Sequence, residues 1–327
     1  MELFRTTVPV SASGKKIDYR SKLMLMGSCF SEHIGNKLSG CRFKVDNNPF
    51  GVVYNPLSVK RGLERLLNPQ PYTADDLFRN GDVWNSFDHH SRFSDVDNAV
   101  CLDAINARLG ESSVFLKQAD FLFITFGTSF VYYLKSTGQV VANCHKVPAQ
   151  EFERRRLSVN EVVDGYTVLL DALWGVNPNL FVVFTVSPIR HWKDGAHENQ
   201  LSKAALLLAI DQICQKYPQA AYFPSYEIVM DELRDYRFYE DDMLHPSKAA
   251  INYIWKRFKE CYMKPKIIVL MREVEQVLQA SQHRPFNPDS DAFRKFAKQF
   301  YDRSRFLEEQ YQIEMDDLIA YFRDRMK

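Results

Sequence analysis

A serine near the start of the chain is the first candidate nucleophile. Residues 23–26 are all apolar, and Gly27 and Ser28 follow them directly. An apolar run this short, bounded by glycine, predicts a buried strand, and Ser31 with Glu32 predicts that a helix begins soon afterwards. Ligands of an open α/β sheet bind beyond the carboxyl ends of the strands, often against a helix N-terminus. The Ser28 hydroxyl is therefore placed to attack a substrate while its own N–H faces the oxyanion that forms, although most Gly-Ser pairs are only turns.

A second polar pair lies late in the chain. Asp242 stands three residues before His245, and Pro246 follows the histidine. This spacing lets a carboxylate accept the imidazole Nδ1–H, which fixes the tautomer and leaves Nε2 free to act as a base. Because proline suits the first turn of a helix, we expect His245 at a junction between a loop and a helix. Together with Ser28, the pair predicts a Ser-His-Asp catalytic triad.

Several short strings resemble the signatures of one family. The sequence Gly-Ser-Cys-Phe-Ser at 27–31 resembles the motif that names the GSCFA-domain proteins. The resemblance spans residues 5–260 and continues in Asn48-Pro49-Phe50-Gly51, Asn143-Cys144-His145-Lys146, Ser187-Pro188-Ile189-Arg190, Tyr222-Phe223-Pro224-Ser225-Tyr226-Glu227 and Leu233-Arg234-Asp235-Tyr236-Arg237-Phe238-Tyr239. This family looks like a branch of the SGNH (GDSL-like) hydrolases, which implies a flavodoxin-like parallel sheet and an esterase-type site. Two departures are visible. Phe30-Ser31 replaces Phe-Ala, and Gly127-Thr128-Ser129 stands where SGNH enzymes usually carry Gly-x-Asn, so one oxyanion donor is unmatched.

Other residues are candidates for binding the oxyanion and the substrate, and the resemblance favours Gly51 among them. The expected oxyanion donors are the N–H groups of Ser28 and Gly51, since glycine lets a ligand approach its backbone; by sequence alone Gly51 is as readily a turn residue. Asn143 has a side-chain amide at a predicted strand end, so it is the candidate for the unmatched oxyanion donor. The alternative is that Asn143 is only a turn or cap residue. Arg190 and His191 are candidates for an anionic substrate group, although such residues are more often surface charge. The full set of candidate substrate-binding residues is Trp84, His90, Ser129, His145, Arg190 and His191.

Thiols and a metal site are the rival interpretations of the chemistry. Cys29 is intrinsically the better nucleophile, but we expect it to pack beneath the turn, because neighbours on an extended chain point in opposite directions. Cys144 and His145 could form a dyad, yet sequence neighbours rarely face each other. No Cys-x-x-Cys or His-Glu-x-x-His spacing occurs, so neither a metal nor a cofactor is expected. The alternative is a zinc site that gathers His90, His145 and His245 from three loops.

Composition argues against several classes of protein. The 327 residues include 42 Lys and Arg against 41 Asp and Glu, so the chain has no electrostatic footprint for nucleic acid or an anionic membrane. A hydrophobic content of 46% fits a globular core. No run of 18 apolar residues is present, which argues against a membrane span, and residues 1–9 lack the features of a secretory signal. The six cysteines are therefore expected to be reduced thiols in a cytoplasmic protein.

Alternating strands and helices must position the candidate residues. Five alternations predict a doubly wound, flavodoxin-like α/β fold with a parallel sheet of about five strands flanked by helices. The predicted strands are 23–26, 41–45, 121–125, 180–186 and 220–223, and the main helices are 55–67, 94–116, 158–173, 201–216 and 246–263; a hairpin covers 130–143. Lys264-Pro265 separates a hydrolase domain, 1–263, from a helical C-terminal extension, 264–327. Its aromatic stripe at helical spacing predicts docking on the parent domain or on a second subunit, which would give a homo-oligomer.

The predicted function is a serine-dependent O-acyl esterase that acts on an acylated carbohydrate or another small-molecule ester. Two alternatives remain at this point. The same triad would serve an O-acyltransferase if water were excluded from the site. The unmatched Gly-x-Asn would also fit a binding or scaffold protein with a degenerate site, because an oxyanion donor typically contributes about 3 kcal/mol to lowering the barrier.

Overall fold

The computed structural model describes residues 6–326. Within them the chain divides into two compact units. Unit 1 comprises residues 6–10, Lys22–Asn36 and Val45–Arg257, and unit 2 comprises Ser11–Ser21, Lys37–Lys44 and residues 258–326. In this described part of the chain, no helix combines the length and the apolar character that crossing a bilayer requires.

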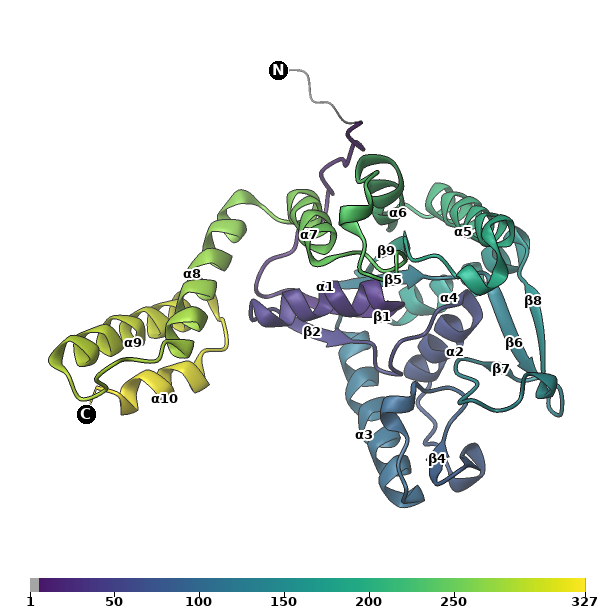
Figure 1. The fold of residues 1–327 in the computed structure, drawn as a ribbon, viewed down its shortest axis with the longest axis horizontal. Helices are drawn as coiled ribbons and strands as arrows, with labels where there is room; N and C mark the ends of the chain where they lie inside the picture. The colour runs from purple at the N-terminus through teal and green to yellow at the C-terminus, as the bar shows by residue number, and fades with distance from the viewer. Residues whose placement is uncertain (1–5, 327) are drawn as a thin grey trace. The chain divides into compact units, whose positions relative to one another are not determined.

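A five-stranded parallel sheet forms the centre of unit 1 (Figure 1). Its strand order is β10-β9-β5-β1-β2, with β1 at Lys22–Gly27, β2 at Lys44–Asn47, β5 at Phe121–Phe126, β9 at Phe181–Val186 and β10 at Ala220–Tyr222. All six residues of β5 are buried, as expected for a parallel strand covered on both faces. In register, Gly27 of β1 is opposite Thr125 of β5, which is opposite Thr185 of β9. The carboxyl ends of these three strands therefore meet at one edge, and the predicted doubly wound α/β fold is confirmed.

Helices follow the strands along the chain. They are α1 Cys29–Gly40, α2 Pro56–Leu67, α3 Asn98–Lys117, α4 Val159–Val176, α5 Ala196–Lys216, α6 Ser225–Glu227 with a π-helical turn at Ile228–Glu232, and α7 Lys248–Tyr262. Local chemistry fixes two of their starts as predicted. The Asn55 Oδ1 accepts the Ser58 N–H at 2.8 Å before α2, and Ser158 with Glu161 forms a capping box before α4.

Some predicted boundaries were wrong. Helix α3 begins at Asn98 instead of residue 94, because the Asp97 carboxylate caps it by accepting the Ala99 N–H at 2.8 Å. Strand β2 begins at Lys44 instead of residue 41, since the chain first leaves α1 through a turn in which Arg42 has a φ of 64°. Both predictions start the element several residues too early, because capping or turn geometry, and not the apolar pattern, decides where it begins.

Two smaller sheets accompany the central one. Strands β6 Phe130–Leu134, β7 Val140–Val141 and β8 Phe152–Arg156 form an antiparallel sheet in the order β7-β6-β8, while β3 Phe78–Asn80 pairs with β4 Val83–Asn85. The β6–β7 hairpin was predicted, but β3, β4 and β8 were not. Strand β8 reads Phe-Glu-Arg-Arg-Arg, so polar residues hide its period-two pattern.

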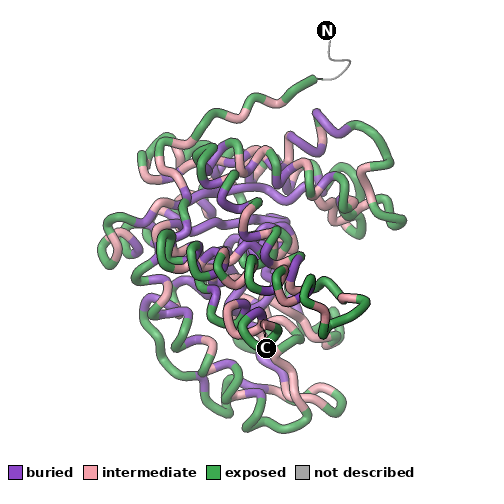
Figure 2. Tube along the Cα trace, turned by 90° about the vertical axis from the view of Figure 1, so that its left-hand side faces the viewer, coloured by how far each residue is buried: buried purple, intermediate pink, exposed green. Residues whose placement is uncertain are grey.

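Aromatic side chains fill the space between the central sheet and its helices. The rings of Phe126 and Tyr166 lie 5.2 Å apart, and those of Tyr166 and Phe184 lie 5.7 Å apart. The Tyr166 hydroxyl donates to the Pro56 carbonyl at 3.0 Å, which satisfies its one buried polar group. Figure 2 shows buried residues running along the central segments and exposed residues along the outer turns. Such packing keeps the strand ends at fixed positions.

Unit 2 contains three helices, α8 Pro265–Gln282, α9 Asp291–Tyr311 and α10 Asp316–Asp324. The aromatic stripe of α9 has partners inside this unit: the Phe300 ring lies 4.8 Å from Phe296 and 5.7 Å from Phe322 of α10. Tyr19 stacks on Phe43 with 4.3 Å between ring centroids. The helical C-terminal extension is therefore present, whereas the predicted homo-oligomer stays a prediction.

Candidate active site

A cavity of about 330 Å³ lies at the carboxyl ends of the central strands. Its lining includes Ser28 from the end of β1, Thr128 from the end of β5 and Ser187 from the end of β9. His245, from the loop before α7, lines the same cavity. The fold thus brings together two predicted residues that are more than 200 positions apart in the sequence. Ligands of doubly wound sheets bind at this location.

Ser28 is held by the turn between β1 and α1. Gly27 has a φ of 136°, and a Cβ at this position would stand 2.1 Å from the Thr125 carbonyl oxygen, so only glycine fits against β5. Ser31 anchors the first turn of α1 by donating to the Met26 carbonyl at 3.2 Å. The Ser28 side chain is 2% exposed, and its Oγ has no hydrogen-bond partner among residues 6–326. Since buried hydroxyls are usually paired, this free Oγ indicates a functional group.

Asp242 and His245 form the predicted pair. The Asp242 Oδ2 lies 2.5 Å from the His245 Nδ1, while Oδ1 accepts the N–H groups of Leu244 and His245, each at 2.9 Å. These bonds, led by the His245 backbone N–H, lower the pKa of Asp242 to about 2. The carboxylate is therefore ionised at neutral pH and holds the imidazole in the tautomer that leaves Nε2 free.

The loop that carries this pair is open to solvent. The His245 side chain is 49% exposed and the Asp242 side chain 47% exposed. Met243 adopts a left-handed backbone with a φ of 59°, which is unusual for a residue with a Cβ. No hydrogen bond in the described chain joins His245 to Ser28. The two side chains share one cavity, but the proton-transfer contact is not made in this conformation.

The three predicted oxyanion donors are not free to bind an oxyanion in this cavity. The Ser28 N–H donates to the Thr125 carbonyl at 3.1 Å, and the Gly51 N–H donates to the Asn48 carbonyl at 2.8 Å. Neither Gly51 nor Asn143 lines the cavity, and the Asn143 Oδ1 caps the following turn by accepting the His145 N–H at 3.0 Å. In this conformation the Ser28 and Gly51 N–H groups are thus engaged with backbone carbonyls, and the Asn143 side chain lies outside the cavity lining.

Two of the six predicted substrate-binding residues line the cavity, namely Arg190 and His191. The other four, Trp84, His90, Ser129 and His145, do not line it. Each of these four instead makes a hydrogen bond to another part of the protein. The Trp84 backbone pairs with Asp95, the His90 Nδ1 accepts the Arg92 N–H at 3.2 Å, the Ser129 Oγ donates to the Ser202 Oγ at 3.1 Å, and the His145 Nε2 lies 2.8 Å from the Ser86 carbonyl.

Cys29 lines the cavity beside Ser28, so the prediction that it packs beneath the turn was wrong. The reason is that α1 begins at Cys29, and a helical residue does not follow the alternation of an extended chain. Burial raises the pKa of the Cys29 thiol, with Tyr54 as a hydrogen-bond partner that opposes this effect. Burial likewise raises the pKa of Cys144. Both thiols are thus poor sources of thiolate.

Cationic and aromatic residues that the sequence did not single out line one side of the cavity. Arg154 of β8 pairs with Asp194 at 2.6 Å, and its guanidinium lies 3.9 Å from the Phe130 ring centroid. The Lys193 Nζ donates to the Tyr132 hydroxyl at 2.8 Å. An isolated Arg-rich run is a weak signal, because only the pairing of β8 with β6 shows that Arg154 reaches this site.

A buried lysine lies among the strand ends. The Lys203 Nζ donates to the carbonyls of Gly127 and Ser187, each at 2.6 Å, and so ties together the segments after β5 and β9. Complete burial lowers its pKa to about 7. A neutral amine has two N–H groups, which matches the two carbonyls. His191, whose pKa burial and nearby Lys203 lower to about 4, is neutral at neutral pH.

Residues 6–326 contain no group of three or more His, Cys, Asp or Glu side chains arranged to hold a metal ion. His90 and His145, which the alternative zinc site needs, lie outside the lining of the cavity that contains His245. The described residues therefore give no support to that alternative.

Comparison with known proteins places the chain in a family. The GSCFA family matches residues 22–258, and the C-terminal domain of GSCFA domain proteins matches residues 274–327. None of the curated proteins compared with the chain matches it.

Several solved structures are similar at low identity. A family 3 carbohydrate esterase from Talaromyces cellulolyticus shares 12% identity, with 77% of this chain and 99% of that one covered and a TM-score of 0.35. A family 3 carbohydrate esterase from Clostridium thermocellum shares 14% identity, with coverages of 77% and 97% and a TM-score of 0.33. The acetyl xylan esterase Est2A from Butyrivibrio proteoclasticus shares 12% identity, with coverages of 77% and 64% and a TM-score of 0.36. At these scores the chemistry of this site has to be argued from its own residues.

Proposed function

We propose that this chain, which belongs to the GSCFA family, is a serine-dependent hydrolase of O-acyl esters of a carbohydrate or another small molecule. One observation carries the proposal. An unpaired, buried Ser28 Oγ shares a cavity with His245, whose Nδ1 is held at 2.5 Å by Asp242. A nucleophile, a base and an orienting carboxylate are the three parts that acyl transfer through serine requires.

The proposed reaction has two stages. The Ser28 Oγ attacks the ester carbonyl while the His245 Nε2 takes its proton, and Asp242 stabilises the imidazolium that forms. The imidazolium then protonates the departing alcohol, which leaves an acyl-serine that water hydrolyses with His245 again as base. Because the N–H groups of Ser28, Ser31 and Gly51 are engaged, we assign oxyanion stabilisation to the N–H groups of Cys29 and Phe30 at the start of α1. The first N–H groups of a helix have no partner within it, and they carry the positive end of its dipole.

Solvent access favours hydrolysis over acyl transfer to an alcohol. A transferase has to keep water from the acyl-serine, whereas the His245 side chain is 49% exposed beside this cavity. Water can therefore reach the base that activates it. The Ser28 hydroxyl and the Asp242–His245 pair beside the same cavity likewise favour an enzyme over a binding or scaffold protein.

A chromogenic acetyl ester tests the proposal directly. The native protein should release the chromophore without an added alcohol, and Ser28→Ala should lower kcat by about 10⁴-fold or more, as loss of a triad nucleophile does in other enzymes. Cys29→Ala is the matched control, because it changes the neighbouring cavity residue and leaves the triad intact. A serine-directed phosphonate should add its mass to the peptide that contains residue 28.

Three results would contradict the proposal. Turnover that survives in Ser28→Ala and disappears in Cys29→Ala would assign the chemistry to the thiol. Turnover only in the presence of an alcohol acceptor would indicate a transferase. Absence of turnover and of phosphonate labelling across a panel of acyl esters would indicate a binding protein.

A further inference from the structure

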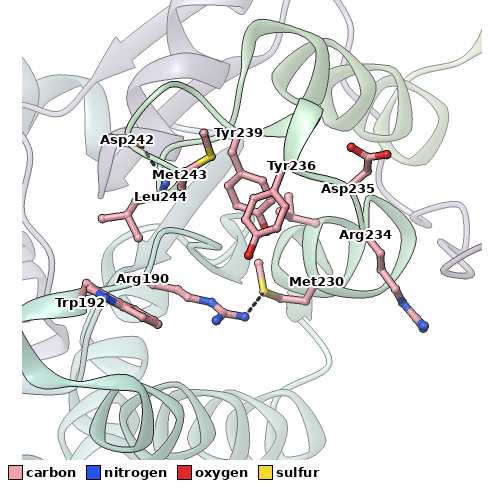
Figure 3. Close-up of a pocket in the computed structure, with 11 residues that line it drawn as sticks. Arg190, Trp192, Met230, Arg234, Asp235, Tyr236, Tyr239, Asp242, Met243 and Leu244 are labelled. Carbon is pink, nitrogen blue, oxygen red and sulfur yellow. Dashed lines mark hydrogen bonds between the residues drawn. The ribbon is translucent and has the colours of Figure 1, made fainter.

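Arg190 lines two cavities at once. One is the cavity that contains Ser28 and His245; the other, of about 450 Å³, contains Asp242 and the neighbouring Met243 and Leu244. Figure 3 shows this second cavity, with the Arg190 side chain extending toward Met230 beneath the rings of Tyr236 and Tyr239. Arg190 follows β9 and precedes α5. Its guanidinium is thus placed at the junction between the catalytic residues and an adjoining space.

The Arg190 guanidinium has no counter-ion among residues 6–326. Its recorded side-chain contact is with the Met230 Sδ, 3.4 Å from Nη2, and a thioether is only a weak acceptor. Arg154, which lines the same catalytic cavity, differs because Asp194 neutralises it at 2.6 Å. A guanidinium presents five N–H donors in a planar fork that matches a carboxylate or a phosphate. A half-buried guanidinium without a protein carboxylate beside it is therefore suited to bind an anion from outside the chain.

The second cavity borders the loop that carries His245. In the proposed reaction His245 donates its proton to the departing alcohol, and Asp242, Met243 and Leu244, which line the second cavity, belong to the same loop as His245. The exposed aromatic side chains of Trp192 and Tyr236 supply apolar surface there. The Asp242 carboxylate is ionised, but His245 and two backbone N–H groups point their positive ends at its oxygens, which weakens the repulsion that an anion bound by Arg190 would meet.

We propose that the natural substrate is an ester of an alcohol that carries an anionic group, a carboxylate or a phosphate, and that Arg190 binds this group. The inference rests on the proposed function, because it takes the cavity of Ser28 as the acyl side and the second cavity as the alcohol side. Arg190 is then a determinant of specificity. It discriminates anionic alcohols from neutral ones through charge-assisted hydrogen bonds, and it takes no part in proton transfer.

A binding experiment separates this inference from catalysis. In the Ser28→Ala background, calorimetry would measure the affinity of 4-acetamidobenzoate, of 4-acetamidophenyl phosphate and of neutral 4-acetamidobenzamide, whose amide replaces the ester. We expect at least one anionic probe to bind about tenfold or more tightly than the neutral one, the factor typical of a hydrogen bond to a charged group. The better of the two anions identifies the carboxylate or the phosphate as the preferred group.

Two variants locate the preference. Arg190→Gln should abolish it, whereas Arg237→Gln should leave it unchanged, because Arg237 is exposed, lies 3.7 Å from Asp235 and lines neither cavity. Equal unfolding midpoints would show that both variants are folded. A preference that survives in Arg190→Gln, or equal affinity for all three probes before that change, would overturn the inference. Failure of the proposed function is seen separately, as absence of ester turnover by the native protein.

Discussion

The two halves of the candidate triad come from regions of opposite character. Ser28 is 2% exposed and is fixed between a central strand and a helix, with Gly27 pressed against the Thr125 backbone. Asp242 and His245 lie on a loop, with about half of each side chain exposed. The sheet therefore holds the proposed nucleophile rigidly, while the loop leaves the proposed base open to solvent. We therefore expect the approach of this loop, with the serine held in place, to complete the proposed site.

Removing the donor and the acceptor of the proposed proton transfer, Ser28 and His245, should produce the largest effect. His245→Ala and Ser28→Ala should each lower kcat by about 10⁴-fold or more, and the double variant should lose little further activity, because triad members act as one unit. Since His245 is exposed, added imidazole should restore part of the activity of His245→Ala and none of that of Ser28→Ala. Steady-state turnover of an acetyl ester measures all three. Losses that multiply in the double variant would show that the residues act independently.

The next largest effect should come from disturbing the rigid region. Gly27→Ala places a Cβ 2.1 Å from the Thr125 carbonyl oxygen at a φ of 136°, and we expect the free energy of unfolding to fall by about 3 kcal/mol. Gly138→Ala is the control, because Gly138 also has a positive φ, of 71°, but no atom lies within 4 Å of its added Cβ. That variant should lose only about 1 kcal/mol. Urea unfolding measures both, and equal losses would mean that contact with β5 does not constrain the turn.

Lys203 should give the rigid region a pH-dependent stability. Its folded pKa of about 7 lies below the value of about 10.4 for an unfolded lysine. Between these values the unfolded chain binds more protons, so the free energy of unfolding contributed by this residue rises as the pH increases from about 7 to about 10. The slope is at most about 1.4 kcal/mol per pH unit.

The Lys203→Met variant is the reference for this measurement. Because the two proteins share all their other titrating groups, the contributions of those groups cancel when the two stabilities are compared. The stability of the native protein minus that of the variant should increase from pH 7 to pH 10 in urea unfolding. A difference that stays flat over this range would show that Lys203 keeps its ordinary pKa.

The smallest effect is expected on the exposed loop. Met243 has a left-handed φ of 59°, which costs a residue with a Cβ about 1 kcal/mol or more. Met243→Gly relieves this strain but gives the unfolded chain more freedom, so the net change in the free energy of unfolding should stay within about 1 kcal/mol. Ester turnover should change by less than about tenfold, because the Asp242 bonds to His245 do not involve the Met243 side chain. A loss of stability as large as that of Gly27→Ala would show that the exposed loop is as tightly constrained as the turn that holds Ser28.

The parts of the fold that the sequence predicted correctly are those with strong local signals. Apolar runs placed β1, β5 and β9 within a residue or two, and capping residues placed α2 and α4. Strand β8 was missed because its arginines belong to a sheet edge, where burial does not enforce an apolar pattern. GSCFA membership was predicted from short motifs and is confirmed by the match over residues 22–258.

The candidate site was harder to predict because much of its lining depends on tertiary pairing. Asp242 and His245 lie close in sequence, so their spacing alone predicted the contact. Arg154 enters the cavity only through the pairing of β8 with β6. The roles of Gly51 and His145 could not be predicted, because each residue has a left-handed backbone that the sequence does not reveal. In that conformation the Gly51 N–H binds the Asn48 carbonyl, and the His145 ring lies against the Ser86 carbonyl.

The strand order has a consequence for synthesis of the protein on the ribosome. After β2 pairs with β1, β5 adds on the other side of β1, and β9 and then β10 each add beside the strand before them. From β5 onward the sheet therefore extends in one direction as the chain emerges. Ser28 is therefore made early, while His245 follows the last of these strands. A nascent chain that ends before residue 242 contains the whole sheet and the proposed nucleophile, but neither Asp242 nor the proposed base His245. The chemistry proposed for unit 1 thus begins only when its synthesis is nearly complete.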